Sequence, residues 1–147
     1  MTDIEPAIVL NKLDFMDNYL KSLERFESIT LEEYLSDYNQ QLVVERLLQL
    51  IIQVALDINR YLLKQLKQEQ PESNFESFIK ISQCNVITTE LAENLAFSGS
   101  LRNRLVHIYE EIDPVKVYAA IQKALQCYPI YQRQVTNYLD SLEANNG

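Results

Sequence analysis

Residues that end or interrupt helices are scarce in this sequence. Its 147 residues include two glycines, four prolines and no tryptophan. Because glycine and proline build most tight turns, we expect little of the chain to form tight turns. What is abundant instead is leucine, isoleucine, valine and alanine, and this composition is typical of a helical bundle. At this length we expect one domain, residues 1–147, with a real hydrophobic core.

Cysteine and histidine are scarce as well. Cys84 and Cys127 lie far apart and are too few for a disulfide scaffold. The single histidine, His107, cannot build a zinc site with two isolated cysteines. The order His107-x-x-Glu110 also reverses the Glu-x-x-His motif of carboxylate-bridged metal bundles. We therefore predict no metal and no cofactor, and we expect both cysteines to be buried as small hydrophobic residues.

Long hydrophobic runs are absent. The most apolar stretch, residues 47–58, is interrupted by three polar residues and falls short of the ~20 residues that a membrane span needs. Asp3 and Glu5 stand where a signal peptide would have its basic region. We therefore expect a soluble, cytoplasmic protein with no membrane segment.

Positive charge is in deficit over the whole chain, whose formal net charge is −8. Residues 1–98 hold eight Lys and Arg against sixteen Asp and Glu, whereas residues 99–135 hold five against three. The overall charge argues against binding nucleic acid over the whole surface. An enzyme that meets RNA in one cleft would have this distribution, and so would a chain with a basic partner.

Apolar periodicity predicts an all-α, up-down helical bundle of four to five main helices. The longest helix, residues 39–67, is apolar over most of its circumference, so we expect it to be the central helix or a dimer face. We also expect Pro129 to kink the last helix and residues 144–147 to fray. The helices are expected at residues 4–27, 31–38, 39–67, 73–81, 88–97, 101–112 and from 114 to the tail.

The clearest break predicted is at residues 98–100, where Gly99 could end one helix and the serine after it could cap the next. This break would place residues 102–104 in the first turn of a helix, whose positive end binds phosphate well. Asp113 and Pro114 should end that helix and begin the last one, as cap and first helical residue.

The stretch from Arg102 to Tyr109 gathers groups with a specific chemistry. Histidine can give or take a proton near neutral pH, and arginine matches a phosphate with two parallel donors. Asn103 and His107 are four residues apart and share one helix face. These groups suit phosphodiester chemistry or phosphate binding, although a structural histidine beside solvated arginines would have the same spacing.

The pattern Arg102-x4-His107-x-Tyr109 resembles the R-x4-H-x-Y motif of HEPN-domain proteins. More closely, the chain is similar to the HepT toxins, the HEPN ribonuclease half of bacterial toxin–antitoxin pairs. The polar Asn103 after the arginine fits the family pattern, as does the Glu-Glu-Ile-Asp-Pro run at residues 110–114. The similarity covers most of the chain, in length, in helical pattern and in the place of the motif.

The resemblance implies a metal-independent endoribonuclease toxin that cuts tRNA or mRNA. His107 would be the general acid/base, Arg102 the phosphate clamp and Asn103 a positioning group, and Arg102 and Arg104 would bind RNA phosphates. The resemblance also implies a two-fold homodimer.

The chemistry of RNA cleavage agrees with a dimer. Attack by a 2′-hydroxyl needs one group to take its proton and one to protonate the leaving oxygen. One chain has one histidine, so a composite site across a dimer would supply two. Glu110 and Glu111 are alternative bases.

HepT toxins are encoded with MntA, a minimal nucleotidyltransferase antitoxin that adenylylates the motif tyrosine, which is Tyr109 here. We therefore expect an MntA-like nucleotidyltransferase as partner. Two other hypotheses stay open, and we rank them second and third. The chain could be a non-catalytic HEPN-type module that binds a nucleotide or a nucleotidyltransferase, or a helical bundle with a coincidental motif.

Overall fold

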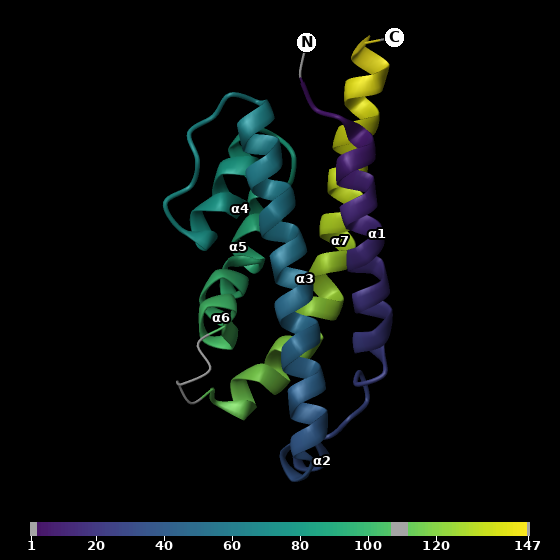
Figure 1. Cartoon of the computed structure of the whole chain (residues 1–147), viewed down its shortest axis with the longest axis vertical. Coiled ribbons are helices and arrows are strands. Elements are labelled where there is room, and N and C mark those ends of the chain that lie inside the picture. The colour runs from purple at the N-terminus through teal and green to yellow at the C-terminus, as the bar shows by residue number, and fades with distance from the viewer. Residues whose placement is uncertain (1–2, 107–111, 147) are drawn as a thin grey trace.

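The structure, a computed structural model, describes residues 3–106 and 112–146, with side chains as far as residue 144. These residues form seven α-helices and no strand, which confirms the all-α prediction (Figure 1). The helices are α1 (Pro6–Glu24), α2 (Leu31–Ser36), α3 (Tyr38–Gln65), α4 (Asn74–Gln83), α5 (Thr89–Asn94), α6 (Ala96–Val106) and α7 (Pro114–Asn146).

The 28-residue helix α3 is the centre of the bundle. It contacts α1, α2, α4, α6 and α7. In Figure 1, α1 and the C-terminal part of α7 run along one side of α3, and α4, α5 and α6 follow one another along the other side. Three short helices therefore occupy the place of one long helix in an up-down bundle. The sequence left two roles open for residues 39–67, the central helix or a dimer face, and the structure has them as the central helix.

The core follows α3 along its length and is mainly aliphatic, and ten residues of α3 are buried in it. One buried polar network is included in it. The Tyr131 hydroxyl donates to Asn59 Oδ1 at 2.7 Å, and Asn59 Nδ2 donates to Ser77 Oγ at 3.1 Å. Because buried polar groups are costly without partners, this network fixes the register of α3, α4 and α7 relative to one another.

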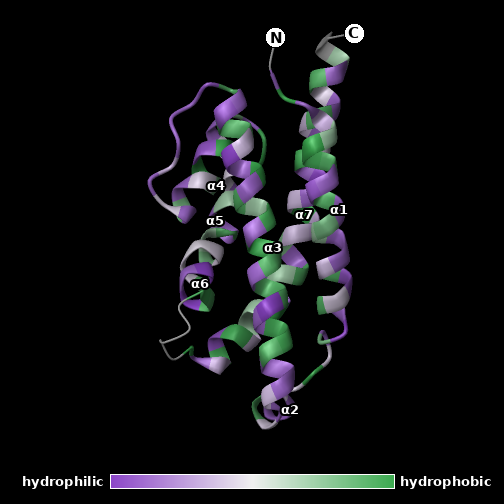
Figure 2. Cartoon of the chain, viewed as in Figure 1, coloured by the Kyte–Doolittle hydropathy of each residue, from purple (hydrophilic) through white to green (hydrophobic). Residues whose placement is uncertain are grey.

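Threonine and serine caps begin three of the shorter helices where the sequence predicted them. Thr30 forms a reciprocal capping box with Glu33, and the Ser73 and Thr88 side chains accept backbone N–H groups at the starts of α4 and α5. The loop between α3 and α4 is mainly hydrophilic (Figure 2), in agreement with the polar linker that the sequence indicates.

The predicted break at residues 98–100 is wrong, because α6 continues through all three. Gly99 has another role in the structure. A Cβ atom at this position would lie 2.8 Å from the backbone nitrogen of Phe75 and 3.3 Å from the carbonyl carbon of Asn74. The glycine therefore allows α6 to pack directly on the start of α4.

The continuous helix changes the surroundings of the predicted site residues. Arg102, Asn103 and Arg104 lie in the second half of α6 and not in its first turn, so the helix N-terminus contributes no positive field to them. Arg104 lies in the last turn, where the negative end of the helix dipole stabilises a cation.

Helix α7 begins as predicted. The Asp113 carboxylate accepts the N–H of Val115 at 3.0 Å, and Pro114 is the first helical residue. Pro129 lies inside the helix, and the two ends of α7 run in different directions in Figure 1. The helix extends through Asn146.

Both cysteines pack against the core but stay partly exposed, so the prediction that they are buried small hydrophobic residues is confirmed only in part. Burial still raises the pKa of the Cys84 and Cys127 thiols, which keeps them protonated at neutral pH. Within residues 3–106 and 112–146, no helix combines the length and hydrophobicity needed to cross a membrane.

Candidate RNA-binding and catalytic site

The guanidinium of Arg102 is partly buried where α6 packs on α3. Its Nε and Nη2 atoms both donate to Gln53 Oε1, at 3.2 and 3.1 Å. Gln53 Nε2 in turn donates to Asp57 Oδ1 at 2.8 Å. The amide thus orients the arginine, and the carboxylate orients the amide. Since a guanidinium has five N–H donors, three remain beyond those given to Gln53 and can receive a phosphate.

Asn103 is the next residue of α6 and is held by α4. Its Oδ1 accepts from Asn74 Nδ2 at 3.1 Å, and Asn74 Oδ1 accepts from Arg60 Nη2 at 2.7 Å. The close packing at Gly99, one turn before Asn103, brings α6 near enough to α4 for this contact. The oxygen of the Asn103 amide is occupied by the contact with Asn74, whereas its nitrogen carries two N–H groups that can donate to a ligand.

Arg102 and Asn103 are joined to the same stripe of α3. Gln53, Asp57 and Arg60 are spaced by four and three residues, which places them on one face of a helix. The structure therefore brings these two predicted site residues together as one polar surface of α3, α4 and α6. Arg60, Arg102 and the exposed Asp57 give this surface a net positive charge, although the chain as a whole has a net charge of −8.

Arg104 lies away from this surface. Two positions along a helix correspond to a turn of roughly 200°, so Arg102 and Arg104 leave α6 on opposite sides. Arg104 lines a cavity between α6 and the start of α7, together with Lys116. If both arginines bind RNA, as the sequence analysis expects, they would contact different phosphates.

His107, Tyr109, Glu110 and Glu111 lie outside the described residues. The roles expected for them therefore stay predictions.

Sequence reasoning missed the three residues that hold the site: Gln53, Arg60 and Asn74. One signal was available for Gln53, since it interrupts the most apolar run of the chain. A glutamine inside such a run is either solvated or hydrogen-bonded to a neighbouring element. The identity of that neighbour depends on which helices are adjacent, and no local pattern states this.

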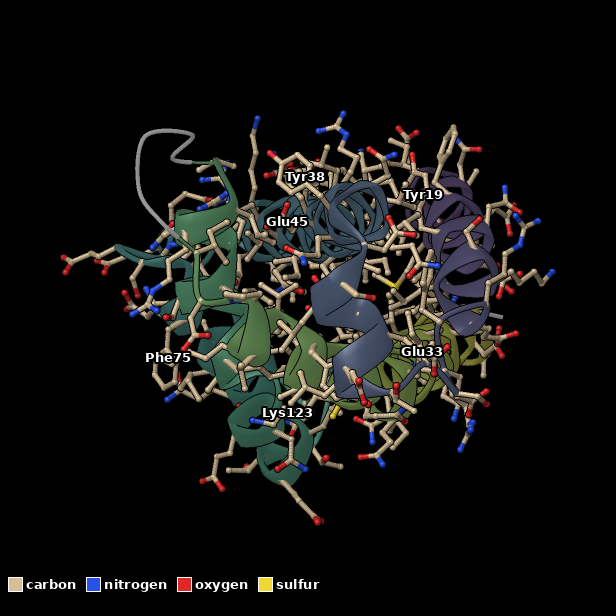
Figure 3. All side chains as sticks on the ribbon, turned by 90° about the horizontal axis from the view of Figure 1, so that it is seen from below. Tyr19, Glu33, Tyr38, Glu45, Phe75 and Lys123 are labelled. Atoms are coloured by element: carbon tan, nitrogen blue, oxygen red, sulfur yellow. The ribbon has the colours of Figure 1, made fainter. Side chains whose placement is uncertain are left out.

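Tyr34 and Tyr38, whose roles the sequence left open, have different environments. Tyr34 is fully buried in α2, and its ring centroid lies 5.7 Å from that of Tyr118. Tyr38 is 70% exposed at the start of α3 and points outward (Figure 3). Tyr34 is therefore a core residue, whereas Tyr38 belongs to the surface.

Comparison with known proteins identifies the family to which this chain belongs. The model of a family described as "Ribonuclease HepT-like" matches residues 16–136. A protein named tRNA nuclease HepT, from Aphanizomenon flos-aquae, is 50% identical over 146 residues, which cover 99% of each chain. An mRNA nuclease HepT from Shewanella oneidensis is 28% identical over 119 residues, which cover 81% of this chain and 89% of that one.

Two solved structures that share this fold are of toxin–antitoxin proteins. A tri-AMPylated Shewanella oneidensis HEPN toxin in complex with MNT antitoxin superposes with a TM-score of 0.78 at 26% identity, over 93% of this chain and 99% of that one. A toxin–antitoxin structure with AMP-PNP has a TM-score of 0.80 at 24% identity, over 89% and 98%, and shares the fold. The chain belongs to the ribonuclease HepT-like family. The family resemblance and the enzyme class predicted from the sequence are confirmed.

Proposed function

We propose that this protein is an endoribonuclease toxin of a toxin–antitoxin pair and that its substrate is tRNA. The observation that carries the proposal is the Arg102 guanidinium, which Gln53 orients beside Asn103 with three N–H donors left for a phosphate. The choice of tRNA follows the relative that is 50% identical along the full chain.

The proposed reaction is a transesterification within the RNA. The 2′-oxygen forms a bond to the adjacent phosphorus and loses its proton, and the 5′-oxygen of the next nucleotide leaves and gains one. His107 acts as general acid/base in these proton transfers. Arg102 stabilises the negative charge of the pentacoordinate phosphate, and Asn103 orients the phosphate or the imidazole. The steps need no metal ion, because a proton donor, a proton acceptor and a cation are sufficient.

A composite site in a two-fold dimer would supply the second histidine. An exposed stripe of α3 supports this proposal: Tyr38 and Leu42 are 70% and 47% exposed, and Arg46, Gln49 and Gln53 continue it at helical spacing. A second copy that packs on the apolar end of the stripe would lie next to the arginine site.

The proposal is tested by removing the acid/base and the clamp separately. Each of His107→Ala and Arg102→Ala is expected to lower the cleavage rate of tRNA by about 10²–10⁴-fold and to abolish growth inhibition, because each removes a group that acts in the transition state. Cleavage is measured on purified chains whose helix content is checked by circular dichroism.

Arg25→Ala is the matched control, since Arg25 is an exposed arginine that follows α1 and lies outside the site. It should cleave tRNA at the wild-type rate. RNA cleavage that survives His107→Ala but stops on addition of EDTA would overturn the mechanism.

The antitoxin is proposed to be an MntA-like nucleotidyltransferase that adenylylates Tyr109. Each AMP group adds a phosphodiester with one negative charge. This charge would compete with RNA phosphate for Arg102 or Arg104, in the way that a phosphoryl group pairs with arginines.

A further inference from the structure

A second positively charged site lies on the other side of α6 from Arg102. It is a cavity of about 250 Å³ between α6 and the first turns of α7. Three cationic side chains from the two helices line it: Arg104, Lys116 and Lys123. Figure 3 places Lys123 on the opposite side of the bundle from Tyr38, so the cavity is separate from the exposed stripe of α3.

The charge of the cavity is unusual for this chain. Six of its lining residues are apolar: Phe97, Leu101, Ile112, Val117, Ala119 and Ala120. In the described part of the chain the ion pairs are Lys21–Asp17 and Lys80–Glu76, and none involves the three cations of the cavity. A concentration of positive charge in a protein of net charge −8 focuses an anion to one place.

The one carboxylate that lines the cavity has another function. Asp113 Oδ1 accepts the N–H of Val115 at 3.0 Å and so caps α7. This hydrogen bond directs the carboxylate toward the helix start, and it makes no ion pair with a described lysine or arginine. The positive charge of the cavity is therefore only partly compensated by its own lining.

The apolar part of the cavity lining can pack against a planar ring such as a nucleobase. Lys123 Nζ lies 5.5 Å from the centroid of the half-buried Phe97 ring, so an aromatic face and a cation border the same space. Nucleic-acid sites that take single-stranded nucleotides combine these two features, a cation for the phosphate and an aromatic face for the base.

We propose that this cavity binds a nucleotide of the substrate RNA other than the one that is cut. Arg104, Lys116 and Lys123 hold its phosphate, and its base lies against Phe97. The inference rests on the proposed ribonuclease function. It also explains why the structure separates Arg102 from Arg104: the first holds the phosphate that reacts, and the second helps to hold the strand on the far side of α6.

The experiment uses Lys116→Gln/Lys123→Gln in the full-length chain and measures steady-state cleavage of a long single-stranded RNA and of a dinucleotide. For the long RNA, KM is expected to rise about tenfold with kcat little changed, because a contact remote from the reaction contributes to binding equally before and in the transition state. The dinucleotide is too short to occupy both sites, so its kcat/KM should not change.

Binding is measured separately with His107→Ala chains, which leave the RNA intact. Removing two of the three cations that hold this phosphate should reduce the slope of log K against log salt by up to about 0.7, the contribution of one neutralised phosphate on a single strand.

Lys12→Gln/Lys64→Gln is the matched control, because it changes the net charge equally at positions on α1 and α3 that do not line the cavity. The proposal is overturned if this control raises KM as much as the cavity variant does, or if the cavity variant impairs dinucleotide cleavage equally. It is also overturned if the cavity variant loses affinity only for free mononucleotide and not for RNA. A wild-type chain that cleaves no RNA would instead refute the proposed function.

Discussion

At the scale of single residues, the arginine of the motif is held by a side chain that the motif does not contain. Arg102 gives two N–H groups to Gln53, and Gln53 gives one to Asp57. A long arginine side chain loses considerable rotamer entropy when it is ordered for a ligand. In the proposed mechanism the glutamine removes part of that cost before RNA binds, and Gln53 is then a positioning residue.

Gln53→Leu is therefore expected to lower kcat/KM for RNA by about tenfold. Hydrogen bonds to a charged group contribute about 1.5–3 kcal/mol, and partial exposure reduces this to about 1.4 kcal/mol, a factor of ten. The decisive measurement is a double-mutant cycle with Arg102→Ala. If Gln53 acts through the arginine, the double variant should be no slower than Arg102→Ala alone. Independent, multiplying losses would show that Gln53 has some other role.

A second prediction at this scale concerns Tyr109. Tyr109→Phe removes only the acceptor hydroxyl, so the variant should stay toxic and should no longer be neutralised by covalent modification. Intact-mass spectrometry after co-expression with the nucleotidyltransferase is the test. The wild-type chain should gain one or more AMP masses and the variant none. The same mass gain in both would place the acceptor on another residue.

At the scale of elements, α6 is positioned by contacts on both of its sides. Gly99 lets it approach the backbone of α4, and the buried Ser98 hydroxyl accepts a hydrogen bond of 2.7 Å from the Tyr128 hydroxyl of α7. Burial raises the pKa of Tyr128, so this hydroxyl keeps its proton and remains a donor. Both contacts lie one turn before the site, so they determine where Arg102 and Asn103 point.

Gly99→Ala tests the packing of α6 on α4. In an exposed helix position this change stabilises a protein by roughly 0.5–1 kcal/mol. Here the new Cβ would lie 2.8 Å from the Phe75 nitrogen, so we expect destabilisation of about 1–3 kcal/mol and weaker RNA cleavage. Urea unfolding gives the free energy, and Ser100→Ala, at an exposed position of the same helix, is the control. A rise in stability would contradict the assigned role of the glycine.

At the scale of the whole molecule, α3 connects the proposed active site with the proposed dimer face. One stripe of the helix carries exposed apolar residues at its start and, further along, Gln53, which binds Arg102, and Arg60, which binds the Asn74 partner of Asn103. A dimer formed there would add a second site next to the first. Two-fold symmetry then provides the second histidine without any further segment of chain.

Co-expression of wild-type with His107→Ala chains tests the composite site. If each site needs the histidine of both chains, only the wild-type dimers, about one quarter of the total, cleave RNA, whereas sites that each use one chain would keep about one half of the activity. Light scattering provides the second measurement. A strictly monomeric chain with full activity, or a mixture that keeps half of the wild-type rate, would refute the shared site.

Much of this protein was predictable from the sequence, because the signals concerned are local. Apolar periodicity depends on 3.6 residues per turn, and capping at Thr30, Thr88 and Asp113 depends on one side chain and the next two or three N–H groups. Both can be read without knowing any neighbour in space. The all-α class, the long helix α3 and the family motif were therefore determined by the sequence itself.

Only the tertiary structure decided what Gly99 does and which residues hold the site. Glycine ends many helices, but it also permits close contact between backbones, and the adjacent helix selects between these two roles. In the same way, Gln53 reaches Arg102 across 49 residues of sequence and Asn74 reaches Asn103 across 29. These contacts form because helices α4 and α6 pack together on α3, and such packing depends on the shape of the whole core.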